Sequence, residues 1–125
     1  MVPPQGIQNV NEKLKKQNRL RKDKDFEILL SSKSRLRQEG ITVVLSRNGL
    51  TFSRLGVRVS KQTGNAVRRS YLRRCVKEIF RRELKEMICG YDLAVFLTKS
   101  FDFQQLRERL TKMVALLKQE KENRC

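Results

Sequence analysis

A dense run of basic residues stands in the middle of the chain: KQTGNAVRRSYLRRCVKE, at 61–78, contains four arginines and two lysines. Arginine presents a planar guanidinium that grips a phosphate through two hydrogen bonds, whereas lysine offers a compact point charge. Successive helical turns place such side chains about 5–6 Å apart, comparable to the spacing of phosphates along a strand. Gly64 favours a turn into a helix N-terminus, where backbone N–H groups attract anions. This stretch therefore indicates binding of a phosphate backbone.

A solvated helix face is the alternative interpretation of the same stretch. With ~100° per residue, one face carries no acidic residue, and like charges at i,i+4 weaken an isolated helix. That face comprises Ser70, Arg73, Arg74, Lys77, Arg81 and Lys85, with Arg69 at its margin and with Glu78 and Glu83 expected to point elsewhere. A solvated face ordinarily intersperses glutamates, so the unrelieved positive sign favours an anionic partner.

The charge of the whole chain supports the same interpretation. Its 125 residues include 29 Lys and Arg against 13 Asp and Glu, which gives a formal net charge of +16. The positive charge is concentrated in the first two-thirds of the chain, and residues 61–85 hold nine basic residues but only two acidic ones. Such an imbalance attracts polyanions at long range. The length suits one domain with one modest core, and no apolar run is long enough to span a membrane.

Several chemistries lack the residues that they need. The chain has no histidine, which removes His general bases and the commonest metal ligand. Its cysteines, Cys75, Cys89 and Cys125, form no Cys-x-x-Cys pair and suit a reducing cytoplasm. The N-terminus shows no charged region followed by an apolar stretch, so we expect no secretory signal. We expect a cytoplasmic protein that holds no metal of its own.

Hydrophobic periodicity predicts the elements that position the basic face. The expected order is α–β–β–α–β–α, an α+β fold with a small mixed sheet of three to four strands and about three helices. Helices are predicted at 22–30, from about 65 to about 87, and at 102–119; strands are predicted at 41–46, 52–60 and 91–98, with a possible edge strand in 31–40. Asn48-Gly49 predicts a hairpin turn, and Thr63 or Asn65 suits the cap of the long helix.

Three segments follow from this assignment. Residues 1–19 are polar with Pro3 and Pro4 and are expected to form a flexible or extended basic tail. Residues 20–119 form one RNA-binding domain, and residues 120–125 are expected to be a frayed C-terminal tail.

With these residues in view, the stretch resembles the signature of the protein subunit of bacterial ribonuclease P, approximately K-x-x-G-N-A-V-x-R-N-x-x-K-R-x-x-R-E. Lys61, Gly64, Asn65, Ala66, Val67, Arg69, the basic pair Arg73 and Arg74, and Glu78 stand at matching places. Ser70 replaces the family's asparagine and Lys77 replaces an arginine. The similarity extends over roughly residues 20–118, including LRKDKDFEILL, RLGVRVSK and GYDLAVFLTK.

The resemblance implies a fold and a function. The long basic helix would lie in a left-handed β–α–β crossover, in a fold similar to a ribosomal-protein and elongation-factor domain. The protein, monomeric on its own, would bind the catalytic RNA and the 5′ leader of precursor tRNA, and Mg²⁺ held chiefly by the RNA would perform the chemistry. No residue of the chain is expected to be catalytic or to bind a metal.

The resemblance and the helical face together give two sets of expected site residues. Those expected to bind the RNA subunit are Lys61, Asn65, Arg68, Arg69, Ser70, Arg73, Arg74, Lys77 and Arg81. Those expected to bind the leader are Phe26, Leu30, Phe52, Arg54 and Arg58. For Phe26 and Phe52 the alternative is a plain core contact, and for the two strand arginines it is a solvated outer face.

Two other functions remain open from the residues alone. A general RNA-binding module, such as a ribosomal protein or an RNA chaperone, accounts for the charge equally well. The spacing of the GNAV-x-R motif favours the ribonuclease P subunit over it. A protein nuclease with its own metal ranks well behind both, because the sequence offers no evident set of ligands.

Overall fold

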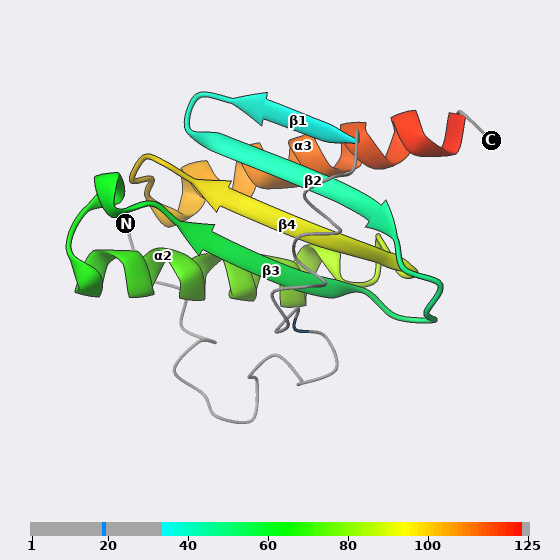
Figure 1. The fold of residues 1–125 in the computed structure, drawn as a ribbon, viewed down its shortest axis with the longest axis horizontal. Helices are drawn as coiled ribbons and strands as arrows, with labels where there is room; N and C mark the ends of the chain where they lie inside the picture. The colour runs from blue at the N-terminus through cyan, green and yellow to red at the C-terminus, as the bar shows by residue number, and fades with distance from the viewer. Residues whose placement is uncertain (1–18, 20–33, 124–125) are drawn as a thin grey trace.

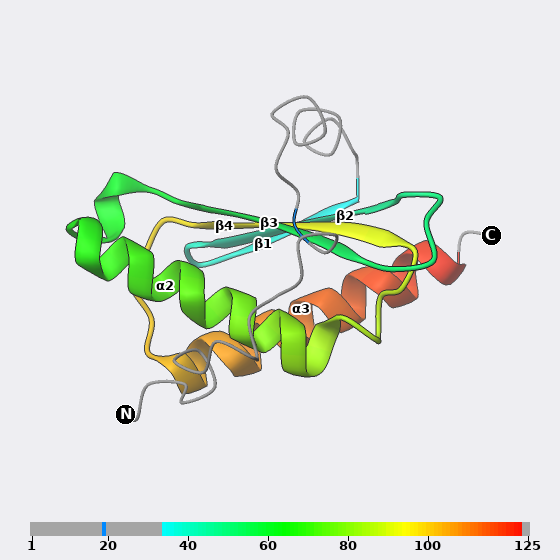
Figure 2. The same cartoon turned by 90° about the horizontal axis from the view of Figure 1, so that it is seen from below.

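The computed structural model describes residue 19 and residues 34–123, which form one sheet with helices on one face (Figures 1 and 2). The elements in chain order are β1 (Arg35–Gln38), β2 (Ile41–Arg47), β3 (Arg54–Val59), a 3₁₀ turn (Lys61–Thr63), α2 (Ala66–Ile79), a π-helical turn (Phe80–Leu84), β4 (Tyr91–Leu97) and α3 (Phe103–Asn123). The α+β class is therefore confirmed. Within these ranges no helix has both the length and the apolar character to cross a membrane. The predicted helix at 22–30 and most of the predicted tail at 1–19 lie outside the described residues.

The strands occur where the alternation of side chains predicts them. β3 turns Leu55 and Val57 toward the helices, whereas Arg54 and Arg58 lie on the other face of the sheet. β4 is buried along nearly its whole length, as its apolar sequence indicates. Residues 31–40 contribute the short edge strand β1, which pairs only with β2.

The strand order corrects the hairpin prediction. Asn48-Gly49 predicts that β2 and β3 pair directly, but the order is β1-β2-β4-β3, so β4 lies between them. β4 pairs antiparallel with β2 and parallel with β3. As the most buried strand, β4 gains a neighbour on each side in this position. Asn48 instead lies beside the start of β4. Its backbone N–H donates to the carbonyl of Gly90, the residue before β4, at 2.9 Å.

The β3–α2–β4 connection is a left-handed crossover, as the resemblance implies. In Figure 1, β3 and β4 run in the same direction in front of α2, and Figure 2 shows α2 and α3 together on one face of the sheet. Parallel crossovers are nearly always right-handed, so this is an uncommon arrangement. It sets α2 along the edge strand β3, and Val67 and Arg74 on the helix remain exposed.

The core lies between the sheet and the two helices. Both helices bury the stripe that the helical period predicts. The buried residues of the α2 region are Leu72, Cys75, Val76, Ile79, Phe80, Leu84 and Ile88, and those of α3 are Leu106, Leu110, Met113, Val114 and Leu117. Phe103 and Met87, on the same faces, are only partly buried.

Two helix boundaries differ from the prediction. α2 ends at Ile79 and continues as the π-helical turn, in which the Lys85 N–H donates to the Phe80 carbonyl at 2.8 Å, an i→i−5 bond. α3 continues to Asn123, beyond the predicted end at Gln119. The segment EKEN is therefore helical, since Glu and Lys are good helix formers and Lys118 pairs with Glu122 at 3.6 Å.

Candidate nucleic-acid interface

The entry to α2 is fixed by a chain of local hydrogen bonds. The Ser60 Oγ accepts from the Gln62 N–H, and the Thr63 hydroxyl donates to the Ser60 carbonyl at 2.8 Å. Gly64 then takes a φ of +147°, and the Asn65 Oδ1 accepts from the Arg68 N–H at 2.9 Å as the N-cap. Of the two capping residues that the sequence offered, Asn65 is the one used. Its side chain is thus committed to the helix.

Gly64 cannot be replaced without strain. A Cβ at this position would lie 3.1 Å from the Cγ of Arg68, and the φ of +147° is one that other residues rarely adopt. We expect Gly64→Ala to lower the free energy of unfolding by about 1–3 kcal/mol in urea titrations. Gly49→Ala is the control, because Gly49 also has a positive φ, +72°, but a Cβ there would meet nothing within 4 Å. An equal or larger loss for Gly49→Ala would show that the close approach to Arg68 is unimportant.

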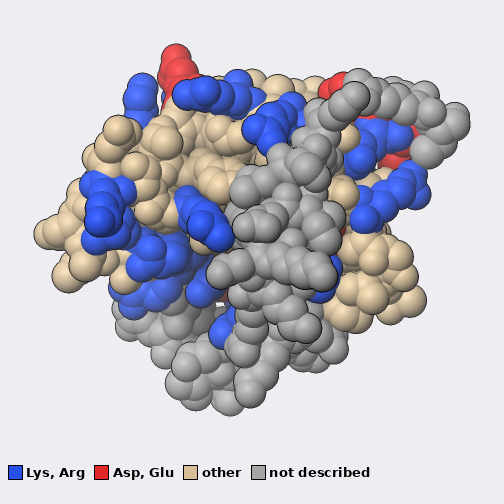
Figure 3. All heavy atoms as spheres, viewed as in Figure 1, with Lys and Arg blue, Asp and Glu red and all other residues tan. Residues whose placement is uncertain are grey.

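A cluster of basic side chains occupies the first three turns of α2. We define the α2 basic face as Arg69, Arg73, Arg74 and Lys77. No carboxylate of the described residues lies within ion-pair distance of these four side chains. In Figure 3 several Lys and Arg side chains lie at the lower left, where Figure 1 places α2 and the end of β3, and others lie along the upper edge and at the right. Four unneutralised cations on one short helix form a surface suited to a polyanion.

Ser70 contacts one of the side chains of the α2 basic face. Its Oγ accepts a hydrogen bond from the Nη2 of Arg73 at 3.2 Å. The hydroxyl that replaces the family's asparagine therefore helps to orient a neighbouring guanidinium. On the same helix, the Nε of Arg69 is buried and has no hydrogen-bond partner among the residues that the structure describes. A buried donor of this kind is costly until an acceptor reaches it.

Arg68, in contrast, is directed toward the loop before α3. Its Nε donates to the Ser100 Oγ at 2.6 Å, and its Nη2 donates to the Phe101 carbonyl at 3.3 Å. Its guanidinium also lies over the ring of Tyr71, 5.2 Å from the centroid. Burial, together with a hydrogen bond to Cys75, raises the pKa of Tyr71 to about 12, so the phenol is neutral at physiological pH. Arg68 thus links the first turn of α2 to the loop before α3, a role that the sequence did not reveal.

The C-terminal end of the predicted face is neutralised, which corrects the expectation for Glu78. This carboxylate is buried and accepts from the Arg81 Nε at 2.8 Å and from the Arg82 Nε at 2.9 Å. Glu83 likewise pairs with Arg107 of α3 at 2.7 Å. The spacings i,i+3 and i,i+4 allow both arginines to reach Glu78, and a buried carboxylate requires such partners. Arg73, Arg74 and Lys77, N-terminal to Glu78, have no described carboxylate partner, and Lys61 is exposed before the helix.

Arg19 lies outside α2 but adds a positive charge near the α2 basic face. It forms an isolated parallel bridge with Leu55 on the free edge of β3. Burial lowers the pKa of Lys77, and the nearby charges of Arg19 and Arg73 lower it further. The Nε of Arg19 is buried and has no hydrogen-bond partner within residues 34–123. The sequence analysis placed Arg19 in a flexible tail, and no local pattern around it indicates the contact with β3.

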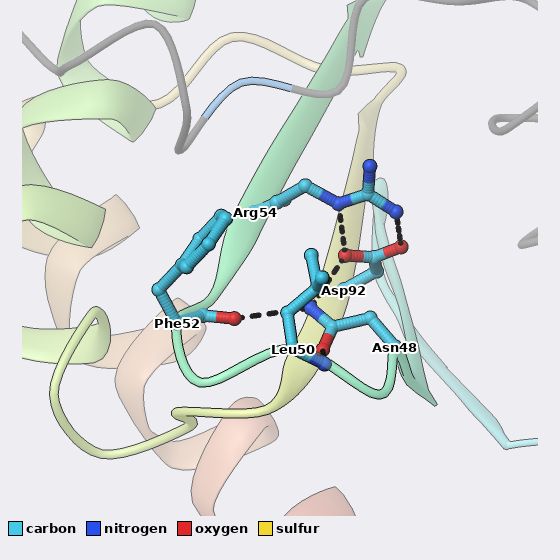
Figure 4. A network of polar contacts seen from close by, with 5 residues as sticks. All are labelled: Asn48, Leu50, Phe52, Arg54 and Asp92. Atoms are coloured by element: carbon cyan, nitrogen blue, oxygen red, sulfur yellow. Dashed lines mark hydrogen bonds and ion pairs between the residues drawn. The ribbon is translucent and has the colours of Figure 1, made fainter.

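The face of the sheet opposite the helices holds a hydrogen-bonded network around Asp92 (Figure 4). Asp92 is 7% exposed and accepts from Arg54 twice, from Nε at 2.8 Å and from Nη2 at 2.7 Å. The Asn48 Nδ2 donates to the same carboxylate at 2.9 Å and to the Phe52 carbonyl at 3.1 Å. The Asn48 Oδ1 accepts from the Leu50 N–H at 2.8 Å. The network therefore fixes the loop between β2 and β3.

This network changes the interpretation of two expected leader-binding residues. The charge of Arg54 is shared with Asp92, and Phe52 is a half-buried residue of the loop that the network fixes. Arg58, which lies on the same face as Arg54, is exposed. Phe26 and Leu30 lie outside the described residues. Asp92 could have been singled out from the sequence, because a lone carboxylate in the apolar strand YDLAVFLT requires a cationic partner.

The remaining candidates are the cysteines, two phenylalanines and possible metal ligands. Cys75 is buried and Cys89 is exposed. Phe80 and Phe101 are buried as core anchors. Among residue 19 and residues 34–123, no three Cys, Asp or Glu side chains are grouped so as to hold a metal ion.

Comparison with known proteins places this arrangement in a family. The family model Ribonuclease P matches residues 14–120. A ribonuclease P protein component of Thermotoga maritima is 35% identical over 112 residues, which cover 84% of this chain and 96% of that protein. The ribonuclease P protein component of a Clostridium botulinum strain is 31% identical over 104 residues, covering 82% of this chain and 94% of the relative.

Solved structures agree with the sequence match. The RNase P protein of Thermotoga maritima aligns with a TM-score of 0.66 at 35% identity, covering 81% of this chain and 96% of that one. The RNase P protein of Staphylococcus aureus aligns with a TM-score of 0.71 at 25% identity, covering 79% and 94%. These similarities agree with the signature before and within α2 and with the left-handed crossover. The chain therefore belongs to the ribonuclease P protein family, which supplies the protein subunit of the endoribonuclease that matures the 5′ ends of tRNAs.

Proposed function

We propose that this chain binds the RNA subunit of ribonuclease P through the α2 basic face and the 5′ leader of precursor tRNA on the face of the sheet opposite the helices. One observation carries the first half: Arg69, Arg73, Arg74 and Lys77 have no described carboxylate partner, whereas Glu78 and Glu83 are paired with other arginines. Net attraction for an RNA backbone is therefore concentrated on this part of α2.

The proposed contact with the leader depends on residues on the face of the sheet opposite the helices. A single strand is bound by cations that follow its backbone and by aromatic rings on which its bases stack. We assign this role to Arg58 of β3 and to the loop residue Phe52, and the resemblance adds Phe26. Arg54 acts indirectly in this proposal, by holding the loop through Asp92. Mg²⁺ bound chiefly by the RNA would supply the hydrolytic chemistry in the cytoplasm.

Reconstitution tests the proposal directly. The full chain is added to a bacterial ribonuclease P RNA with precursor tRNA over a series of magnesium concentrations. We expect the protein alone to cleave nothing and the complex to cleave at a lower magnesium concentration than the RNA alone, because the protein's cations replace part of the ionic screening. A ribosomal RNA fragment serves as competitor. Unchanged magnesium dependence, or equal affinity for the ribosomal fragment, would favour a general RNA-binding module instead.

The leader contact yields a separate prediction. We expect Phe26→Ala to weaken binding of leader-containing precursor tRNA to the holoenzyme by about 1–3 kcal/mol, since one stacked base is lost. Binding of mature tRNA should change little. Leu116→Ala is the control, because Leu116 is an exposed apolar residue, 55% accessible, on α3. Equal losses for both RNAs would assign Phe26 to folding.

A further inference from the structure

Phe96 of β4 lies on the face of the sheet opposite the helices. Its chain neighbours Val95 and Leu97 belong to the hydrophobic core, so the alternation of side chains along the strand turns Phe96 to the other face. Phe96 is half-buried there and is not part of the core cluster. The sequence predicts YDLAVFLT only as an apolar central strand, and neither its pattern nor the resemblance gives Phe96 a function.

The strand register places Phe96 in a row that crosses all four strands. Phe96 is paired with Arg58 of β3 on one side and with Thr42 of β2 on the other, and Thr42 is paired with Arg37 of β1. Residues paired in this way carry their side chains on the same face of the sheet. We call these four residues the Phe96 row. Both arginines are exposed and Thr42 is half-buried, so the row presents a ring and a hydroxyl between two exposed cations.

This composition suits a single RNA strand. Aromatic rings on one face of a four-stranded sheet stack RNA bases, and cations beside them follow the RNA backbone. Neighbouring strands are about 4.8 Å apart, so the row spans about 14 Å from Arg37 to Arg58, which about two to three nucleotides can cover. Asp92, the carboxylate on the same face, is already bonded to Arg54 and Asn48. The bases of a duplex are stacked on each other, so a ring that stacks a base selects an unpaired strand.

We propose that the Phe96 row binds the 5′ leader of precursor tRNA, with one leader base stacked on Phe96 and a phosphate at each of the two arginines. The Thr42 hydroxyl then lies beside the ribose, where it can bond the 2′-OH that distinguishes RNA from DNA. This inference rests on the proposed function and deepens it, because it carries the leader across the strands of the sheet to the edge strand β1. Arg37 of that strand becomes a leader contact.

The stacked base can be detected in the unmodified chain. The holoenzyme is reconstituted from the full chain and ribonuclease P RNA, and it is given precursor tRNAs that carry 5-iodouridine at one leader position at a time. Irradiation joins iodouridine to an aromatic ring stacked on it, and mass spectrometry identifies the peptide. We expect one leader position to crosslink to Phe96. Leaders that crosslink at no position to Phe96 would contradict the proposal.

The affinity of the leader tests the same contact independently. Phe96→Leu should weaken binding of leader-containing precursor tRNA to the holoenzyme about 5- to 30-fold and leave mature tRNA unchanged, and Phe96→Tyr should restore the binding because it keeps a ring. Phe103→Leu is the matched control, since Phe103 is also half-buried but packs on the helical side of the sheet. Equal losses for precursor and mature tRNA in Phe96→Leu would assign Phe96 to folding.

Arg37 tests the path of the leader to β1. Arg37→Gln should weaken leader binding about three- to tenfold near 0.1 M salt and reduce the slope of log K against log salt by about 0.7, the value for one phosphate contact of a single strand. Lys112→Gln removes an exposed cation from α3 and should change neither quantity. Equal effects of the two substitutions would mean that the leader does not reach β1.

The failure of the Phe96 row and the failure of the proposed function are distinguishable. If Phe96→Leu binds precursor tRNA as the unmodified chain does while Phe26→Ala still weakens this binding, the proposed leader site stands and the Phe96 row is wrong. If neither substitution affects binding of the leader, the leader contact of the proposed function is wrong as well.

Discussion

Replacing Arg73, Arg74 and Lys77 together by glutamine should weaken binding to ribonuclease P RNA by about 100- to 500-fold near 0.1 M salt. Each lost phosphate contact reduces the slope of log K against log salt by roughly 0.7–0.9, so three contacts should reduce it by about 2–3. The measurement is a filter-binding or fluorescence titration at several salt concentrations. These three side chains have no described carboxylate partner whose loss would complicate the result.

The matched control is Lys112, Lys118 and Lys121 on α3, also changed to glutamine. Both triple variants remove three positive charges from a net +16, but α3 carries its lysines among glutamates, and Lys118 already pairs with Glu122. We expect the α3 variant to retain most of its affinity and nearly the full salt slope. Equal losses in the two variants would mean that net charge alone, and not the α2 basic face, determines RNA binding.

Stability should distinguish a lost contact from a damaged fold. Arg73, Lys77 and Arg19 repel one another in the free protein, and burial adds to the cost of the Lys77 charge. The α2 triple variant should therefore unfold at an equal or higher urea concentration than the unmodified chain. Weaker RNA binding together with undiminished stability is the pattern that a binding surface produces and a structural element does not.

Local patterns in the sequence predict the helices and strands well, because each element's period depends on its own residues. The alternation Leu55-Gly56-Val57 predicts a strand, and the spacing of Leu72, Cys75 and Ile79 predicts a helix stripe, and both are confirmed. The order of the strands depends on which strand needs two neighbours, and the Asn48-Gly49 pair carries no information about that. The hairpin prediction fails for this reason.

Side-chain partners are predictable only in part, since they depend on elements distant in the chain. Helical spacing places Arg73 and Lys77 on one face correctly, but it does not reveal that Arg68 binds Ser100 across 32 residues of sequence. Nor does it show that the buried Glu78 neutralises Arg81. The candidate site is therefore smaller than the sequence suggests, and Arg19 adds a charge to it from outside the helix.

The second large effect concerns stability, at the carboxylate that fixes the loop before β3. Asp92→Asn should lower the free energy of unfolding by about 2–4 kcal/mol, measured by urea denaturation near pH 7. Asp92 accepts three hydrogen bonds, two from Arg54 and one from Asn48, and its side chain is only 10% exposed. The amide keeps the size of the side chain but loses its charge and one acceptor, which leaves the partly buried guanidinium of Arg54 without its counter-ion.

The control for this loss is Glu122→Gln, the same carboxylate-to-amide change in the exposed Lys118–Glu122 pair of α3. An exposed ion pair contributes little, so we expect a change within about 0.5 kcal/mol. A similar small loss for Asp92→Asn would show that the network around it does not hold the loop. Arg58→Gln, on the same face of β3, should weaken binding of leader-containing precursor tRNA, because that face loses one cation. If Asp92→Asn also weakens leader binding under conditions where the variant is fully folded, Arg54 and the loop that it holds take part in the leader site through their position, because the charge of Arg54 remains in that variant.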